Sequence, residues 1–208
     1  MRLYTISASL YCAKLRILLR HKRLEWEEIP PPGGYGSEEY KRIVPAGNLP
    51  ALEHDGWLLS DSEAIAEYLN ETFPEPDMLP GDIRERARIR ELSRFHDTRL
   101  EPALRALFPH IAIENRDTDF VLRQWFVLQE RLLQAEPLLS QVHEPLTLGD
   151  CGFPVSCLWI EVLTSRFEMK PVLSDTMKAY LAAVSKHSAV AAELTDYRLH
   201  LTNWLASK

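Results

Sequence analysis

The residues with the most evident chemical potential lie in two short stretches, residues 44–52 and 59–69. In the first, the pair Leu49-Pro50 leads into an apolar segment, whose backbone N–H and C=O groups can pair with an extended peptide. In the second, a polar Ser60-Asp61-Ser62 precedes an amphipathic run, and a helix start offers N–H groups and a dipole to a carboxylate. Together the two stretches predict a site for a small acidic peptide.

Ser9 and Cys12 are the other candidates, because they lie where a helix is expected to begin. A serine hydroxyl at a helix N-terminus is a common cap. A cysteine in the first helical turn can have a low thiol pKa, which thiol exchange requires. Since position 9 is serine, no Cys-x-x-Cys disulfide can form there, and packing in the core is the alternative role of Cys12.

Composition narrows the class of protein. The 208 residues carry a net charge of −6, with 46% hydrophobic and 26% charged residues, as expected of a soluble globular protein. The acidic balance argues against binding to nucleic acid or anionic membranes, and no segment has the roughly 20 apolar residues of a membrane span. Lys14 and Arg16 interrupt the first apolar segment, and three cysteines are too few for a disulfide scaffold. We therefore expect a cytoplasmic protein without nucleic-acid or membrane partners.

The first 75 residues predict a compact α/β domain. Strands are expected at residues 2–6, 24–29, 50–54 and 57–59. A helix after Ser9 joins the first two strands in a right-handed βαβ unit, and Asp55-Gly56 between the last two is a strong hairpin signal. A capping box of the form Ser60-x-x-Glu63 then begins the next helix. The predicted order is β-α-β followed by β-β-α.

Residues 76–81 lie in a proline-rich linker, and only helical patterns follow in residues 82–208. Helices are expected over residues 82–108, 118–139 and 147–167 and from Ser174, with short helices closing the chain. Bends are expected near Pro102 and at Pro154. Apolar residues in the second of these helices recur at spacings of four and three, which indicates a face turned to the core. The second domain is thus predicted to be an all-helical bundle.

In this order and spacing the motifs resemble those of the cytosolic glutathione S-transferase superfamily, over essentially the whole chain. Gly47-Asn48-Leu49-Pro50 with Asp61-Ser62 resembles the family's Gly-x-Val/Leu-Pro motif and the acidic-or-amide–Ser pair that follows it. The segment from Thr147 to Asp150 resembles the family's Ser/Thr-x-x-Asp box. Residues 9–12 are similar to the first-helix signature of the serine- and cysteine-type classes, but Leu10-Tyr11-Cys12 departs from the zeta-class pattern and leaves the class open.

The resemblance implies a thioredoxin-like domain (βαβ–ββα) over residues 1–75, a linker at 76–81 and an all-helical domain over 82–208. It implies a glutathione S-transferase-like enzyme of detoxification, which activates the glutathione thiol for attack on a small electrophilic or hydrophobic acceptor. Glutathione is then a co-substrate and no metal is required. A cytoplasmic homodimer is expected on the same ground.

The resemblance also assigns roles to single residues. Ser9 would donate a hydrogen bond to the glutathione thiolate, and a cis Leu49-Pro50 bond would present the Leu49 backbone to the cysteinyl unit. Asn48 would contact the glutathione backbone, while Asp61 and Ser62 would bind the γ-glutamyl unit. The acceptor pocket is expected between the domains, built from the loop after Ile6, the long helix near Phe95 to Phe108 and the C-terminus, with Trp204 as a candidate wall.

Several alternatives stay open. The chain could be a non-catalytic glutathione transferase-like interaction module, or a thiol transferase that depends on Cys12. Ser9 could be only a helix cap. Asp97 could reach glutathione in a partner subunit or lie on a solvated helix face, and Lys41 could pair with the glycyl carboxylate.

Overall fold

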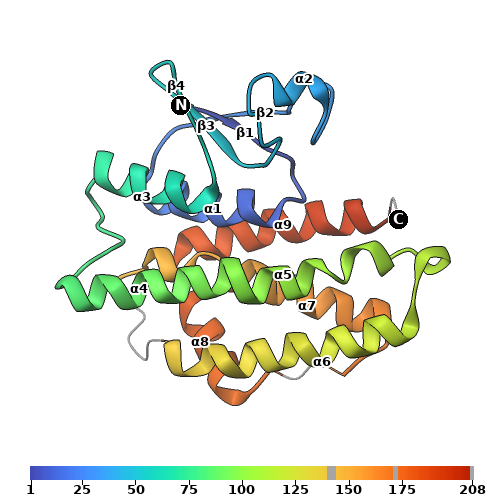
Figure 1. The fold of residues 1–208 in the computed structure, drawn as a ribbon. Helices are drawn as coiled ribbons and strands as arrows, with labels where there is room; N and C mark the ends of the chain where they lie inside the picture. The colour runs from blue at the N-terminus through green and yellow to red at the C-terminus, as the bar shows by residue number, and fades with distance from the viewer. Residues whose placement is uncertain (140–143, 171–172, 207–208) are drawn as a thin grey trace.

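A four-stranded mixed sheet forms the N-terminal part of the computed structural model, which describes residues 1–139, 144–170 and 173–206 (Figure 1). The strands are β1 (Arg2–Tyr4), β2 (Glu27–Ile29), β3 (Ala51–His54) and β4 (Trp57–Ser60), in the order β2-β1-β3-β4. The helices between and after them are α1 (Leu10–His21), α2 (Glu38–Lys41) and α3 (Ser62–Thr72). β1 pairs parallel with β2 and antiparallel with β3, which confirms the predicted βαβ–ββα order.

Helices α1 and α3 lie between the sheet and the helical part of the chain, as Figure 1 shows. Leu3 and Leu52, cross-strand partners on β1 and β3, are buried together with most of α1. On its other side α1 packs against α7 and α9 from the helical part. One continuous hydrophobic core therefore joins the sheet to the helices.

The remainder of the described chain is helical, as predicted. Its helices are α4 (Ile83–Phe95), the π-helical turn η1 (His96–Leu100), α5 (Glu101–Arg105), α6 (Thr118–Ala135), α7 (Phe153–Phe167), α8 (Asp175–Val184) and α9 (Ser188–Ala206). Short 3₁₀ turns lie at Phe108–His110, Ile113–Asn115, Glu136–Leu138 and Leu148–Asp150. Residues 73–82 carry no helix or strand, and a domain division at 76–81 stays a prediction of the sequence.

The apolar spacing in α6 selected the correct face. Its buried residues are Val121, Trp125, Leu128, Leu132 and Ala135. Each lies three or four residues from the next, so all of them face the core on one side of the helix.

The start of α3 differs from the prediction by one residue. Ser60 is the last residue of β4 and pairs with Ala51, so the strand extends through the predicted cap. Asp61 is the cap instead: its Oδ1 accepts from Glu63 N at 3.0 Å and from Ala64 N at 3.1 Å. The predicted Ser60–Glu63 capping box was therefore wrong, because Ser60 belongs to strand β4 and not to the start of the helix.

Pro102 and Pro154 each lie in the first turn of a helical segment. Helix α4 continues through η1 into α5, and at this π-helical turn, just before Pro102, the Glu101 N–H bonds to the His96 carbonyl five residues back. Pro154 lies in the first turn of α7, where a missing N–H leaves no gap in the ladder, so no bend occurs. The predicted Thr147–Asp150 contact is present but precedes α7: Asp150 Oδ2 accepts from Thr147 N at 3.0 Å.

The chain closes on one long helix, and the predicted short helices were wrong. The buried residues of α9 are Ala189, Val190, Glu193, Tyr197 and Leu201. Glu193 occupies a core position and is fully buried, which interrupts the apolar pattern that would have indicated the helix. Its Oε1 accepts from Arg16 Nε at 2.7 Å, so a buried ion pair joins α9 to α1.

Candidate functional site

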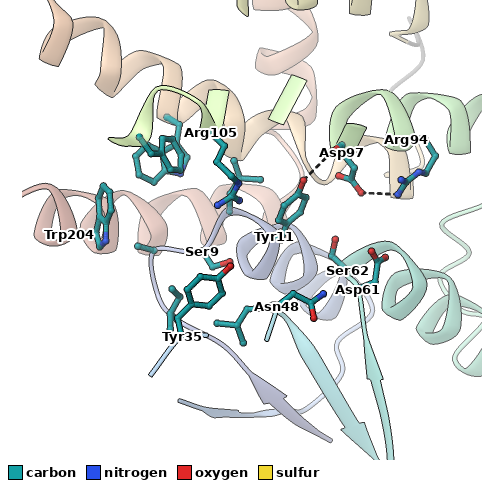
Figure 2. A pocket seen from close by; sticks show the side chains of 16 residues that line it. Ser9, Tyr11, Tyr35, Asn48, Asp61, Ser62, Arg94, Asp97, Arg105 and Trp204 are labelled. Carbon is teal, nitrogen blue, oxygen red and sulfur yellow. Dashed lines mark hydrogen bonds and ion pairs between the residues drawn. The ribbon is translucent and has the colours of Figure 1, made fainter. Parts of the chain in front are cut away.

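A cavity of about 400 Å³ lies where the sheet-containing domain meets the helices (Figure 2). Five of the predicted site residues line it: Ser9, Asn48, Leu49, Asp61 and Ser62. Pro50 does not line the cavity, but the Leu49–Pro50 peptide bond is cis, as predicted. The chain thus brings residues from three separate loops to one surface.

Ser9 is both the N-cap of α1 and a lining residue of the cavity. Its Oγ accepts from Cys12 N at 3.3 Å. A hydroxyl has one donor and two acceptor positions, so the cap leaves the O–H donor available. Capping and donation to a bound anion are therefore compatible in the same side chain.

Leu49 and Asn48 form the second wall. No other described residue takes up the Leu49 N–H or C=O in a hydrogen bond, so both can pair with a peptide. Asn48 is fixed through its backbone, because Tyr40 donates its OH to the Asn48 carbonyl at 2.8 Å. The Asn48 Oδ1 atom is buried and has no hydrogen-bond partner among the described residues, which leaves an acceptor for a ligand N–H.

Asp61 and Ser62 form the third wall at the start of α3. Asp61 has φ 86°, a region that non-glycine residues rarely adopt and that recurs at functional sites. One carboxylate oxygen caps the helix, which leaves the other available to a cation. No described residue bonds the Ser62 hydroxyl, and the first N–H of a helix has no partner in its own ladder. This end of the cavity can therefore bind a carboxylate and an ammonium group together.

Cys12 lies outside the cavity, in a small cluster of buried residues with Tyr4 and Tyr40. Its side chain is fully buried, and this burial raises the pKa of the thiol despite the nearby hydroxyls of Ser9 and Thr5. Such a thiol is neutral and inaccessible to a substrate. Lys41 also lies away from the cavity and pairs with Glu38 at 2.8 Å.

The opposite side of the cavity is aromatic, and the segments predicted for the acceptor pocket contribute to it, whereas Tyr11 and Trp159 were missed. Trp204, predicted as a candidate wall, lines it together with Ile6, Tyr11, Arg105, Phe108 and Trp159. Phe108 stacks on Trp159 at 4.3 Å between ring centroids, and Trp159 meets Trp204 edge-on at 5.4 Å. We call these six residues the acceptor wall. Tyr11 and Trp159 come from α1 and α7, and no local spacing could have grouped them with the predicted segments.

Helix α9 fixes the loop that carries Ser9. The buried Tyr197 OH donates to the Ala8 carbonyl at 2.7 Å and accepts from Trp159 Nε1 at 2.7 Å. One hydroxyl thus joins the residue before Ser9 to the acceptor wall. Their relative position depends on α9.

A buried ion cluster lies behind the site. The Lys14 ammonium donates to Glu63 Oε2 at 2.6 Å and to Asp97 Oδ2 at 2.8 Å. Glu63 follows Ser62 in α3, whereas Asp97 belongs to η1 and lines the cavity. The cluster continues from Asp97 Oδ1 to His96 Nδ1 at 2.8 Å. It therefore joins the start of α3 to the helical part through a residue of α1.

The same contacts determine the state of Asp97. Burial alone would raise the pKa of its carboxyl, but the hydrogen bond to His96 and the charge of Lys14 outweigh burial and hold it at about 2. The side chain is only 7% exposed, so of the two alternatives for this residue the solvated helix face is wrong. In Figure 2, Asp97 also pairs with Arg94, which lines the cavity above Ser62.

No group of three or more potential metal ligands occurs among the described residues. Within the same ranges, no helix has the length and apolar character needed to cross a membrane.

Comparison with known sequences links the chain to one family. The model of "Glutathione S-transferase, N-terminal domain" matches residues 3–77. Glutathione S-transferase Z1 of Arabidopsis thaliana is 38% identical over 90 residues, which cover 42% of this chain and only 41% of the plant protein. Maleylacetoacetate isomerase of Rattus norvegicus is 29% identical over 86% of this chain and 87% of its own length.

One further relative is not named as a transferase, and one solved structure shares the fold. The stringent starvation protein A homolog of Pasteurella multocida is 28% identical over 93% of this chain and 90% of its own length. A delta-class glutathione transferase of Nilaparvata lugens has the same fold, with a TM-score of 0.79 at 20% identity over 97% of this chain and 98% of its own. At this identity the structural likeness concerns the fold alone.

Replacement of the central cation should destabilise the protein strongly. Lys14→Met leaves the carboxylates of Glu63 and Asp97 buried without their shared ammonium, and we expect a loss of about 3–5 kcal/mol in the free energy of unfolding. The measurement is urea denaturation followed by circular dichroism. Lys178→Met, which removes an exposed lysine paired with Asp175, is the matched control and should change stability by less than about 1 kcal/mol. Equal effects of the two variants would contradict the role of the cluster.

The stability supplied by Asp97 should depend on pH in a defined direction. Its folded pKa is about 2, below the ordinary value of 3.8, so its contribution is complete above pH 3.8 and is lost as the pH falls towards 2. Asp97→Asn should therefore be less stable than the wild type by about 2 kcal/mol at neutral pH, with a gap that narrows below about pH 4. Urea denaturation at intervals from pH 7 to 3 measures it. A gap that stays constant over this range would refute the ionised, paired state.

Proposed function

The chain belongs to the cytosolic glutathione S-transferase superfamily, and from this premise we propose that it is a glutathione-dependent transferase. The observation that carries the proposal is the convergence of Ser9, Asn48, Leu49, Asp61 and Ser62 on one cavity. Each of these residues offers a group that suits a different part of glutathione. Cytoplasmic location and a role in detoxification are parts of the same proposal.

The tripeptide would bind as an added strand. The Leu49 N–H and C=O would pair with the cysteinyl unit, and the buried Asn48 Oδ1 would accept a peptide N–H. The γ-glutamyl carboxylate would bind the first N–H and the hydroxyl of Ser62 at the N-terminus of α3, while Asp61 would accept from the α-ammonium. These contacts place the cysteinyl sulfur near Ser9.

Ser9 would then lower the pKa of the bound thiol. Its free O–H donates to the thiolate, and the N-terminus of α1 favours the same negative charge. The thiol proton leaves to solvent, the thiolate sulfur forms a bond to an electrophilic carbon held against the acceptor wall, and the leaving group departs from that carbon with its bonding electron pair. No step requires Cys12, whose neutral thiol is buried.

The relatives support a glutathione-dependent transferase or isomerase without deciding the acceptor. One is named a glutathione S-transferase and another maleylacetoacetate isomerase. The departure at Leu10-Tyr11-Cys12 from the zeta-class pattern argues against assigning the isomerisation to this chain.

A non-catalytic interaction module is the alternative function. The chain is similar along nearly its whole length to a stringent starvation protein A homolog, which is not named as a transferase, and this similarity favours the alternative. The open donors and acceptors at Ser9, Asn48 and Ser62 favour the enzyme. Calorimetric titration with glutathione separates the two functions. If glutathione does not bind at millimolar concentration, the enzyme is excluded and the interaction module is the remaining function.

Removal of the Ser9 hydroxyl should raise the pKa of bound glutathione. Because the thiolate loses a charge-assisted hydrogen bond, we expect Ser9→Ala to raise the thiol pKa by about one unit and to lower kcat about tenfold near neutral pH. The thiol pKa is measured from the ultraviolet absorbance of the thiolate against pH, and kcat from conjugation of an aryl halide. Glutathione affinity should change little.

Two control variants make this test specific. Ser9→Thr keeps both the cap and the hydroxyl and should retain most of the effect on the thiol pKa. Cys12→Ala removes the buried thiol and should leave kcat within about threefold. If Ser9→Ala changes only thermal stability, Ser9 is a cap alone; if Cys12→Ala abolishes turnover, the thiol transferase is the correct function.

We further propose a homodimer in which the outer face of α6 contributes to the interface. Leu122, Phe126 and Leu133 are 44%, 61% and 57% exposed and lie four and seven residues apart, on one face of the helix. Such a row of large apolar side chains on a surface favours contact with a second copy.

A charge in this row should separate the subunits. Phe126→Glu is expected to shift the sedimentation equilibrium mass from that of two chains towards that of one 24.0 kDa chain, because the interface would have to bury an unpaired carboxylate. Leu199→Glu, at an equally exposed leucine on α9, is the control and should leave the mass unchanged. A Phe126→Glu dimer as tight as the wild type would rule out this face.

A further inference from the structure

Arg105 is the one charged side chain among the described residues of the acceptor wall. The other members are Ile6, Tyr11, Phe108, Trp159 and Trp204, which offer flat apolar surfaces. The remaining charged lining residues, Asp61, Arg94 and Asp97, come from the start of α3 and from α4 and η1, close to Ser62 in Figure 2. The acceptor wall thus combines aromatic rings with a single cation.

Arg105 is held in place before any ligand binds. Its guanidinium pairs with Glu101, one helical turn earlier, and Glu101 is itself buried and accepts from the Tyr11 OH at 2.9 Å. The guanidinium carbon also lies 5.6 Å from the centre of the Tyr11 ring and 5.7 Å from that of Phe108. These contacts fix the side chain between two rings, so little conformational entropy is lost when it binds a further group.

The guanidinium retains unused donors. It carries five N–H groups, and its contact with Glu101 is made through Nη2, so the donors exceed what the two oxygens of one carboxylate can engage. No other described residue accepts from Arg105, whose side chain is 49% exposed, and Figure 2 shows the group directed from α5 towards Ser9. The free donors therefore face the space in which the acceptor would meet the thiolate.

We propose that Arg105 binds a carboxylate on the acceptor, so that the substrate class is a flat, conjugated or aromatic electrophile that carries a carboxylate. The planar guanidinium fork matches a carboxylate with two parallel hydrogen bonds. The rings of Phe108, Trp159 and Trp204 provide a surface for the flat body beside it. This proposal rests on the proposed glutathione transfer, whose acceptor it names.

The test compares two electrophiles with the same ring and leaving group, one with an ionised carboxylate and one without: 4-chloro-3-nitrobenzoate and its methyl ester. In both, the glutathione sulfur forms a bond to the ring carbon, chloride leaves with the bonding electron pair, and the thiol proton goes to solvent. Each kcat/KM is divided by the uncatalysed rate constant with glutathione, which removes the difference in intrinsic reactivity. We expect this normalised ratio to favour the acid by about tenfold or more, since a charge-assisted pair with Arg105 is available only to the carboxylate.

The variants locate the preference at Arg105. Arg105→Met should lower the acid-to-ester ratio about tenfold or more, and Arg105→Lys should restore part of it. Since Arg105→Met leaves Glu101 buried without its cation, the double variant E101Q/R105M is measured with it and should show the same loss. Arg99→Met, which removes an exposed arginine of η1 outside the cavity, should leave the ratio unchanged.

Two results overturn the proposal: a wild-type ratio that does not favour the acid, or an acid preference that survives in both Arg105 variants that lack the charge. If neither electrophile is turned over, the proposed transfer has failed, and calorimetric binding of 3-nitrobenzoate and its methyl ester decides the Arg105 site by itself. A preference for the acid that Arg105→Met removes supports the site; equal binding of acid and ester, or none, refutes it.

Discussion

Lys14 carries a positive charge into the interior, and the elements around the cavity are arranged to neutralise it. Its side chain is 3% exposed, and an ammonium so deeply buried is costly unless anions surround it. Glu63 and Asp97 provide them, one from α3 and the other from η1. Because Glu63 follows Ser62 and Asp97 lines the cavity, the contacts that neutralise Lys14 also fix two sides of the site. The stability of the junction and the geometry of the cavity thus depend on one set of atoms.

The two parts of the chain contribute different groups to the site. The sheet-containing domain presents backbone groups and a helix start, which suit a peptide, while the helical part supplies the acceptor wall of rings and one cation. Helix α9 connects the two: Tyr197 bonds the Ala8 carbonyl next to Ser9, and Glu193 accepts from Arg16 of α1. A loop carrying a reactive group is mobile unless it is bonded in this way. The last helix of the chain therefore determines how rigidly the first loop is held.

Where sequence and structure agree, the signal was local. The Ser9 cap and the Asp55-Gly56 hairpin arise from contacts within a few residues, and the buried face of α6 follows from the period of its own helix. Where they differ, a distant partner intervened. Ser60 pairs with Ala51 in the sheet and therefore does not cap α3. In α9 the buried Glu193 interrupts the apolar pattern, because it accepts a hydrogen bond from Arg16, more than 170 positions earlier.

By itself the sequence determined the order of elements in the α/β domain, the cap at Ser9 and, to within one residue, the start of α3, because short-range hydrogen bonds and apolar periodicity encode them. The Leu49-Pro50 corner followed only from the resemblance of its motif to that of the family. Only the tertiary structure decided that Cys12 is buried, that Asp97 is paired rather than solvated, and that Arg105 lies between two rings at the acceptor wall. Burial and ion pairing depend on which surfaces meet after folding. No local sequence pattern indicates that residues of α1, α5 and α9 will be in contact.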